Sequence, residues 1–229
     1  MSIRLSPRLQ RIADYVLAGA KVIDVGTDHA YIPIWLLQEG VSSAAVATDI
    51  KPGPLSNAAK DAEKAGVSDR LELLLCDGLS ACSAEMADTV IIAGMGGETI
   101  IGILDAAPWA AEKRLILQPQ TKFTELRCWL RSHGLAITDA SLTYDAGRIY
   151  LVWLVERGEL RDCAIIDPVL MEKRDPLLKP YLEYHIKRLR KQIYGMERSA
   201  SADPQQLCGN RGELEEIMKC YEEVQTWQT

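Results

Sequence analysis

One short segment, residues 22–31 with the sequence VIDVGTDHAY, constrains the fold more than any other part of the chain. It opens with a short apolar run rich in β-branched residues, which is typical of a strand covered on both faces. Gly26 follows where the backbone must turn sharply, and residues 30–39 then carry apolar side chains at helical spacing. A buried strand that passes through a glycine into a helix predicts a ligand-binding crevice in an open α/β sheet.

The loop after this strand limits which cofactor it can hold. A dinucleotide fingerprint needs closely spaced glycines for a pyrophosphate, but after Gly26 the next glycine is Gly40. Asp24 and Asp28 flank Gly26, and two carboxylates repel a diphosphate while they attract a cation. We therefore predict S-adenosylmethionine, which carries sulfonium and ammonium groups. The simpler alternative is an ordinary strand-to-helix turn with a capping aspartate.

The second predicted strand, residues 43–49, also ends in an acid. Asp49 lies 23 residues beyond Gly26, and a carboxylate at this spacing can accept hydrogen bonds from both ribose hydroxyls of a nucleoside cofactor. We assign Asp49 and the following Ile50 to the cofactor site.

The third predicted strand, residues 71–75, is followed by Asp77 and Gly78. The carboxylate of Asp77 can accept a hydrogen bond from the exocyclic amine of adenine, and Gly78 lets the base approach the backbone. Acids after three successive strands favour a nucleoside site at one edge of the sheet.

A glycine-rich turn, GMGG at residues 94–97, follows the fourth predicted strand, residues 88–93. Three glycines in four residues leave space over the crevice, so that a ligand or substrate can touch the backbone there. The fifth predicted strand, residues 113–117, ends in Gln118, Pro119 and Gln120, whose amides can hydrogen-bond a base edge.

The order of these elements predicts the fold class. Five βα units are followed by a hairpin around residues 145–147, which is the plan of the class I methyltransferase fold, a Rossmann-like sheet of seven strands. From residue 176 onward two helical runs, broken near residues 199–212, predict a C-terminal helical hairpin resembling a coiled coil. We place the domains at residues 1–160 and 161–229.

Charge is distributed unevenly along a chain whose net charge is −6. The overall sign argues weakly against a nucleic-acid partner, because phosphates are bound by Lys and Arg. Residues 171–198 nevertheless hold eight basic and four acidic residues, which indicates either a surface for a polyanion or a solvated helix face. The candidate nucleic-acid contacts are Arg8, Arg11, Lys187, Arg188 and Lys191.

Other classes of protein are disfavoured by composition. No stretch approaches the ~18 apolar residues of a membrane span, and the N-terminus lacks a signal-peptide core, so we expect a cytoplasmic protein. The six cysteines include no CxxC pair, which argues against a zinc site and a disulfide framework. We expect no bound metal and a monomer.

The motifs together resemble a known family. SPRLQRIADYV, DVGTDHAYIP, AGMGGETI, LILQP and GRIY are similar to segments of the bacterial tRNA (adenine-N1)-methyltransferases that act on adenine 22 in the D-arm, and the resemblance covers essentially the whole chain. It implies a class I fold, S-adenosylmethionine as methyl donor, tRNA as substrate and a C-terminal helical domain that helps to hold the tRNA.

The resemblance also assigns roles to residues. The methionine end of the cofactor would be lined by Asp24, Gly26, Asp28 and His29, the ribose by Asp49, and the adenine by Asp77 and Gly78. Gly94 and Met95 would lie beside the methyl group and the target base. Apart from the resemblance, we hypothesise that Gln118 and the backbone of residues 94–97 orient the base, with Tyr31 and His29 as stacking or hydrogen-bonding partners. The alternatives are that His29 only fixes its loop and that Tyr31 packs in the core.

The sequence departs from the family pattern at a few positions. Thr27 stands where serine is usual, Gln120 where asparagine often follows the proline, and Asp49 where glutamate is also common. The pair Asp167–Pro168 replaces an expected Gly-Pro, which leaves the interdomain junction open. Alternative functions are methylation of another RNA, a protein or a small molecule, and tRNA binding without catalysis.

Overall fold

A computed structural model describes residues 3–159, 166–199 and 203–227 of the 229-residue chain. The chain divides into two compact units, Met1–Cys163 and Ala164–Thr229. The boundary expected between residues 160 and 161 lies outside the described residues. Each unit is considered by itself below.

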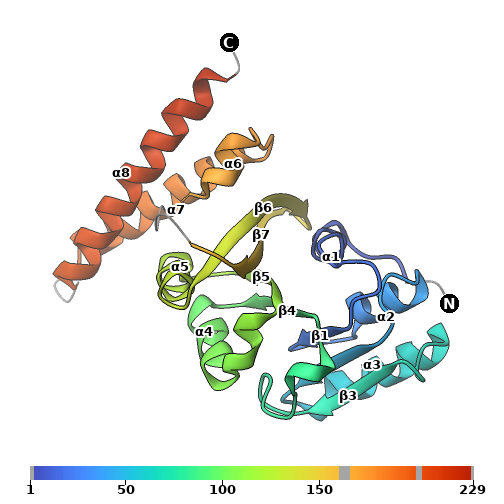
Figure 1. The fold of residues 1–229 in the computed structure, drawn as a ribbon. Coiled ribbons are helices and arrows are strands. Elements are labelled where there is room, and N and C mark those ends of the chain that lie inside the picture. Colours follow the sequence, from blue (N-terminus) through green and yellow to red (C-terminus); the bar gives the residue numbers. More distant parts are fainter. Residues whose placement is uncertain (1–2, 160–165, 200–202, 228–229) are drawn as a thin grey trace. The chain divides into compact units, whose positions relative to one another are not determined.

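The first unit is built on one seven-stranded sheet with the strand order β3-β2-β1-β4-β5-β7-β6 (Figure 1). The strands up to β5 run parallel, and β7 pairs antiparallel with both β5 and β6. This topology confirms the predicted class I methyltransferase fold. The strands are β1 Val22–Val25, β2 Ala45–Asp49, β3 Leu71–Leu75, β4 Thr89–Met95, β5 Arg114–Pro119, β6 Leu135–Asp145 and β7 Arg148–Arg157.

Among residues 3–159, five α-helices pack against the sheet, and apolar side chains line their inner faces. The cluster beneath the first helix includes Ile12, Leu36, Ile91, Ile116 and Val152, all with 0% exposure, so helix and sheet share one core. The helices are α1 Pro7–Ala13, α2 Tyr31–Gln38, α3 Pro52–Ala65, α4 Gly97–Ala106 and α5 Phe123–Ser132, with 3₁₀ turns at Ala84–Met86 and Pro108–Glu112.

Apolar residues at helical spacing between Leu9 and Val16 predict a helix that begins after Ser6 and ends near Gly19, but α1 ends at Ala13. Its start is as expected: Ser6 caps the helix by accepting a hydrogen bond from Leu9 N, and Pro7 occupies the first turn. After Ala13 the backbone tightens into turns in which Val16 N donates to Ala13 O. These turns still carry Val16 into the core, which explains why its position fits the helical pattern.

The parallel register brings the ends of the central strands to one edge. In β1, Val25 lies opposite Thr48 of β2 on one side and Ile92 of β4 on the other. The chain order reverses at β1, because β2 and β3 lie on one side of it and β4 and β5 on the other. Such a reversal point is where open α/β sheets bind ligands.

The second unit is helical and comprises α6 Pro168–Glu172, α7 Leu178–Glu197 and α8 Pro204–Thr226. Helix α6 is a short element that the sequence pattern did not indicate. Helices α7 and α8 form an antiparallel hairpin: Glu197 pairs with Arg211 at one end, and Tyr221 donates to Glu183 nearer the other. The predicted helical hairpin is therefore present. The expected break at residues 199–212 is too long, because Asp203 caps α8 and Pro204 begins it. Within the described ranges, no helix is both long and apolar enough to cross a membrane.

Candidate functional site

The loop after β1 is organised by a chain of hydrogen bonds that ends at Asp24. The backbone N–H of Ala30 donates to Thr27 Oγ1 (3.0 Å), and the Thr27 hydroxyl donates to Asp24 Oδ2 (2.8 Å). A serine hydroxyl could make the same bonds, so Thr27 conserves the chemistry expected of the loop. Ala30 has a left-handed backbone (φ 52°), an arrangement that costs about 1 kcal/mol for a residue with a Cβ.

Asp24 is itself a buried carboxyl, with 7% of its surface exposed. Burial raises its pKa from the ordinary value of 3.8 to about 6, although the hydrogen bond from Thr27 acts in the opposite direction. A buried carboxylate without a cationic partner is costly. A ligand that brings a positive charge to Asp24 would remove part of that cost, which is what the predicted cofactor would supply.

The next three candidate residues differ in exposure. The Asp28 side chain is 81% exposed, while His29 is half-buried and its imidazole Nδ1 lies 2.8 Å from Asp61 Oδ2 on α3. Tyr31 stacks on the His29 ring with centroids 4.9 Å apart and an interplanar angle of 12°. Tyr31 is 41% exposed, so the alternative that it packs in the core is wrong.

The loop after β1 and the glycine-rich turn at the end of β4 meet at Gly26 and Met95. Gly26 has a left-handed backbone (φ 73°), and a Cβ added there would collide with the Cε methyl of Met95. The absence of a side chain at Gly26 therefore leaves room for Met95 over the end of β1. The β1 loop and the glycine-rich turn are thus adjacent parts of one surface.

The acids predicted for the nucleoside end lie on the β1–β2–β3 side. Asp49 ends β2, and its carboxylate accepts from Lys51 N at 2.7 Å. The side chains of Ile50 and Asp77 are exposed. Thr48 donates to the carbonyl of Gly78 at 2.9 Å, which ties the third loop to the end of β2. These predicted residues therefore share one edge of the sheet.

On the other side of β1, Gln118 is almost fully buried, with 1% exposure. Its Oε1 accepts from Arg8 Nη1 at 3.1 Å, and its Nε2 donates to the carbonyl of Pro119 at 3.1 Å. The Arg8 guanidinium also lies over the Tyr150 ring, 5.2 Å from the centroid. Gln118 thus has both amide groups occupied, and Arg8 joins the end of β5 to the β6–β7 hairpin.

The glycines of the GMGG turn serve different purposes. Gly94 has a left-handed backbone (φ 78°), and a Cβ built there would meet only polar side-chain ends at ordinary contact distances. Gly97 donates its N–H to Thr121 O at 2.9 Å, and a Cβ on Gly97 would collide with the Lys122 carbonyl oxygen. Only part of the turn therefore leaves space for a ligand, whereas Gly97 permits close packing of two backbones.

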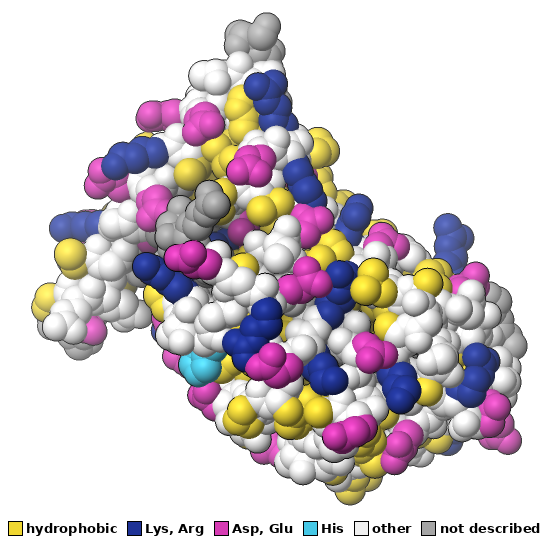
Figure 2. All heavy atoms as spheres, in the orientation of Figure 1, with side chains coloured by type: hydrophobic (Ala, Val, Ile, Leu, Met, Phe, Trp, Pro, Cys, Tyr) yellow, Lys and Arg dark blue, Asp and Glu magenta, His cyan; other side chains and the backbone are white. Residues whose placement is uncertain are grey.

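Basic residues of the second unit are concentrated on α7 rather than spread over the hairpin. Lys187 and Lys191 are exposed and Arg188 is half-buried, on the same side of the helix as the exposed Tyr184 and Tyr194. Helix α8 is predominantly acidic by sequence. On the face of the molecule that Figure 2 shows, Lys and Arg are mixed with Asp and Glu and form no continuous basic patch.

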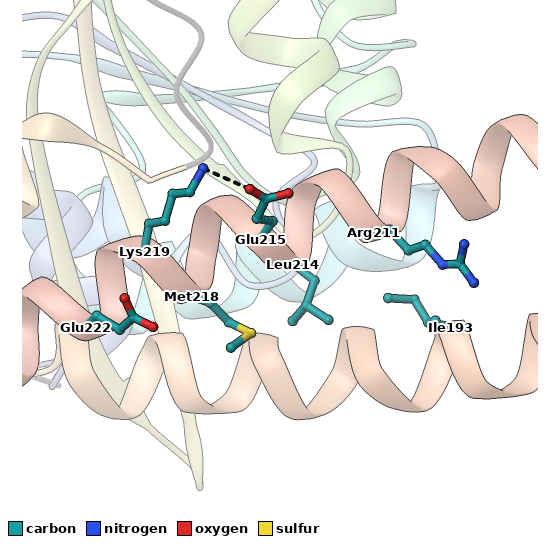
Figure 3. Close-up of a pocket in the computed structure, with 7 residues that line it drawn as sticks. All are labelled: Ile193, Arg211, Leu214, Glu215, Met218, Lys219 and Glu222. Carbon is teal, nitrogen blue, oxygen red and sulfur yellow. Dashed lines mark ion pairs between the residues drawn. The ribbon is translucent and has the colours of Figure 1, made fainter.

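A groove of about 530 Å³ runs along the hairpin and is lined mostly by α8. Figure 3 shows Leu214 and Met218 of α8 facing α7, from which Ile193 points back at them, while Lys219 pairs with Glu215 on α8. Its titratable residues are all exposed to solvent, which does not favour catalysis there: Arg211, Glu215, Lys219 and Glu222. Across the described residues, no group of three or more His, Cys, Asp or Glu side chains could hold a metal ion.

Comparisons with known proteins agree with this geometry. A family model described as a methyltransferase domain matches residues 5–153. The tRNA (adenine(22)-N(1))-methyltransferase of Bacillus subtilis is 33% identical over 237 residues, a match that spans 97% of each chain. The chain belongs to this methyltransferase family.

Solved structures extend the family likeness to three dimensions. A Streptococcus pneumoniae relative in complex with S-adenosyl-L-methionine has a TM-score of 0.84 at 29% identity, covering 95% of this chain and 100% of that one. M. capricolum TrmK in complex with S-adenosyl-homocysteine has a TM-score of 0.77 at 27% identity, covering 96% and 99%. Both alignments include the C-terminal helices as well as the sheet.

Three residues beside the candidate site were not singled out from the sequence as site residues. Asp61 binds His29 from α3, and Tyr150 lies beneath Arg8 from β7. Gln120 was noted as one amide of the QPQ segment and as a departure from the family pattern, and it is exposed beside Gly94. No local signal marks Asp61, which reaches His29 from a helix distant in sequence. Tyr150 was noted only as the last residue of the GRIY motif, and its contact with Arg8 depends on the packing of α1 against β7.

Proposed function

We propose that this protein methylates N1 of adenine 22 in the D-arm of tRNA with S-adenosylmethionine as the donor. The observation that carries the proposal is the match to the B. subtilis enzyme over 97% of both chains, which includes the sheet and the helical unit. Enzymes that share only the methyltransferase sheet act on many substrates, so likeness over the full length is the stronger argument.

The residues at the sheet edge fit the proposed cofactor. The buried Asp24 and the exposed Asp28 provide negative charge at the methionine end, where the ammonium group would lie, and His29 completes that end. Asp49 would bind the ribose, with Ile50, Asp77 and Gly78 around the adenine. Asp24 supports the fit most directly, because a cationic ligand relieves the cost of its burial.

The cofactor would supply an electrophilic methyl group, and the protein would place the base. Adenine N1 carries a lone pair once it is unpaired, so the enzyme needs no strong base to create the nucleophile. Alignment of reacting groups can contribute ~7 to 11 kcal/mol. Gly94 and Met95 would border the reacting centre, and Tyr31 would stack on the base. The buried Gln118 would help to orient the base by fixing the residues around it. The methylated ring is cationic, so nearby carboxylates and carbonyls would stabilise it.

Basic side chains would hold the tRNA while the target base leaves its stack. Unstacking costs a few kcal/mol, which contacts to the phosphates must offset. We assign these contacts to Arg8 and Arg11 on α1 and to Lys187, Arg188 and Lys191 on α7. The exposed Tyr184 and Tyr194 beside the α7 cations add aromatic surface of the kind that stacks on unpaired bases. A tRNA substrate also implies action in the cytoplasm.

The test is methyl transfer from labelled S-adenosylmethionine to an unmodified tRNA transcript, compared with one whose adenine 22 is changed to guanine. We expect label on the first transcript and none on the second. Label on both would indicate another target nucleotide. Cofactor binding without label on either would instead favour a small-molecule or protein substrate, or tRNA binding without catalysis.

A further inference from the structure

Two amides lie at the end of β5, and the structure separates their roles. Gln118 is buried, its oxygen is held by Arg8 and its nitrogen by the Pro119 carbonyl. A base cannot reach this amide without displacing Arg8. Gln120 is exposed, and within the described part of the chain its carboxamide makes no hydrogen bond. The donor and acceptor of Gln120 are therefore available to a substrate.

The backbone holds Gln120 next to the glycine-rich turn. Its N–H donates to the carbonyl of Met95 at 2.9 Å, which anchors the residue at the level of the turn. A Cβ placed on Gly94 would lie 3.7 Å from Gln120 Nε2 and 3.6 Å from Arg8 Nη1. The Gln120 amide and the Arg8 guanidinium thus approach Gly94 together, at a position that has no side chain of its own.

We propose that the carboxamide of Gln120 recognises the target adenine by pairing with its N6 and N7 edge. This inference rests on the proposed function. An amide side chain can accept a hydrogen bond from N6–H and donate one to N7, and it thereby distinguishes adenine from guanine, which presents two acceptors on that edge. Pairing on this edge leaves N1 free, which methylation of N1 requires.

The neighbouring Arg8 cannot perform this role. A guanidinium has only donors, so it cannot accept a hydrogen bond from N6–H. Arg8 is already engaged by Gln118 and Tyr150, and it keeps the Gln118 oxygen occupied. Gln120 is accordingly the amide beside Gly94 that can both donate and accept.

The experiment compares two tRNA transcripts, one with adenosine and one with 7-deazaadenosine at position 22. The second lacks the N7 acceptor but keeps N6 and N1. For each enzyme variant the ratio of kcat/KM on the two transcripts is measured, so that the different intrinsic reactivity of N1 cancels between variants. In Q120A the preference for adenosine should fall about tenfold relative to the unchanged protein, the effect of one lost hydrogen bond.

Controls separate recognition from a structural role. Q120N keeps an amide and should retain most of the preference, whereas Q205A removes an exposed glutamine on α8 and should leave the ratio unchanged. The dissociation constant for S-adenosyl-homocysteine and the Tm of Q120A should equal those of the unchanged protein. The same ratio in Q120A as in the unchanged protein would overturn the inference. No methylation of the adenosine transcript by the unchanged protein would overturn the proposed function, and this inference with it.

Discussion

The imidazole Nδ1 of His29 lies 2.8 Å from Oδ2 of Asp61, and this contact links the motif loop to helix α3. The hydrogen bond with His29 is the largest cause of the lowered pKa of Asp61, and Lys64 acts in the same direction. The ring of Tyr31 stacks on the His29 imidazole. Asp61 therefore determines the orientation of a ring that the family pattern places at the cofactor.

We predict that Asp61→Ala weakens S-adenosyl-homocysteine binding about tenfold, since one hydrogen bond that orients His29 is lost. Isothermal titration calorimetry gives the dissociation constant. Glu63→Ala, which removes an exposed carboxylate from the same helix, is the matched control and should bind like the unchanged protein. Equal affinity in both variants would show that the orientation of His29 does not matter for binding.

We predict that Asp24 lowers the stability of the ligand-free protein at neutral pH and strengthens cofactor binding. Its pKa is raised to about 6 by burial, so the folded protein binds this proton more tightly than the unfolded chain. Protonated Asp24 therefore stabilises the folded protein. This contribution to the free energy of unfolding is fully present below the ordinary pKa of 3.8 and is lost as the pH rises through about 6. The difference corresponds to about 3 kcal/mol at neutral pH. Asp24→Asn should therefore raise the Tm of the ligand-free protein at pH 7.5 and abolish tight cofactor binding.

Cofactor affinity should depend on pH for the same reason. A cationic ligand favours the ionised carboxylate, so below pH 6 each binding event must first release a proton from Asp24. We expect the affinity for S-adenosylmethionine to fall by up to tenfold per pH unit below 6 and to be flat between pH 7 and 8. Calorimetry at pH 6 in buffers of different ionisation enthalpy should detect the released proton. A flat profile from pH 5 to 8 would exclude Asp24 as the cation's partner.

Two glycines of helix α4 should respond oppositely to alanine. A Cβ at Gly97 collides with the Lys122 carbonyl oxygen, a backbone atom that cannot easily move, whereas a Cβ at Gly102 meets nothing within 4 Å. Gly97→Ala should lose about 2 kcal/mol or more of unfolding free energy. Gly102→Ala should gain about 0.5 to 1 kcal/mol, because alanine is the better helix former. Urea unfolding measures both, and similar values would contradict the assigned close packing.

The α7 cations should control the salt dependence of tRNA binding. Replacing Lys187 and Lys191 by glutamine removes two phosphate contacts and should reduce the slope of log K against log salt by about 1.4 to 1.8. Lys219→Gln on α8 is the control, since Lys219 already pairs with Glu215 at 2.9 Å. Filter binding at several salt concentrations gives the slopes. An unchanged slope in the double variant would mean that α7 forms a solvated face rather than a tRNA contact.

Local patterns were sufficient to predict most of the fold. The predicted bounds of β3 agree with the structure residue for residue. The same holds for the helix that the sequence predicts from Pro52 to Ala65, because a proline begins it and Gly66 follows its end. The ends of elements that depend on contacts with neighbouring elements differ more from the predicted bounds. Strand β4 runs on to Met95 through an irregularity after Ala93, where pairing with β5 compensates for the glycine, and α1 stops at Ala13 instead of continuing to Gly19.

The candidate site was likewise predicted only in part from the sequence. The amino-acid order by itself determined that acids lie at or just after the ends of β1, β2 and β3 and that a glycine-rich turn lies at the end of β4. Parallel strands bring these ends to one edge of the sheet. Only the tertiary structure decided which side chains are available there. It buries Gln118 beneath Arg8 and leaves Gln120 exposed, and it brings Asp61 to His29 across 32 positions. Burial and partnership between distant residues depend on how helices pack onto the sheet, which no local periodicity encodes.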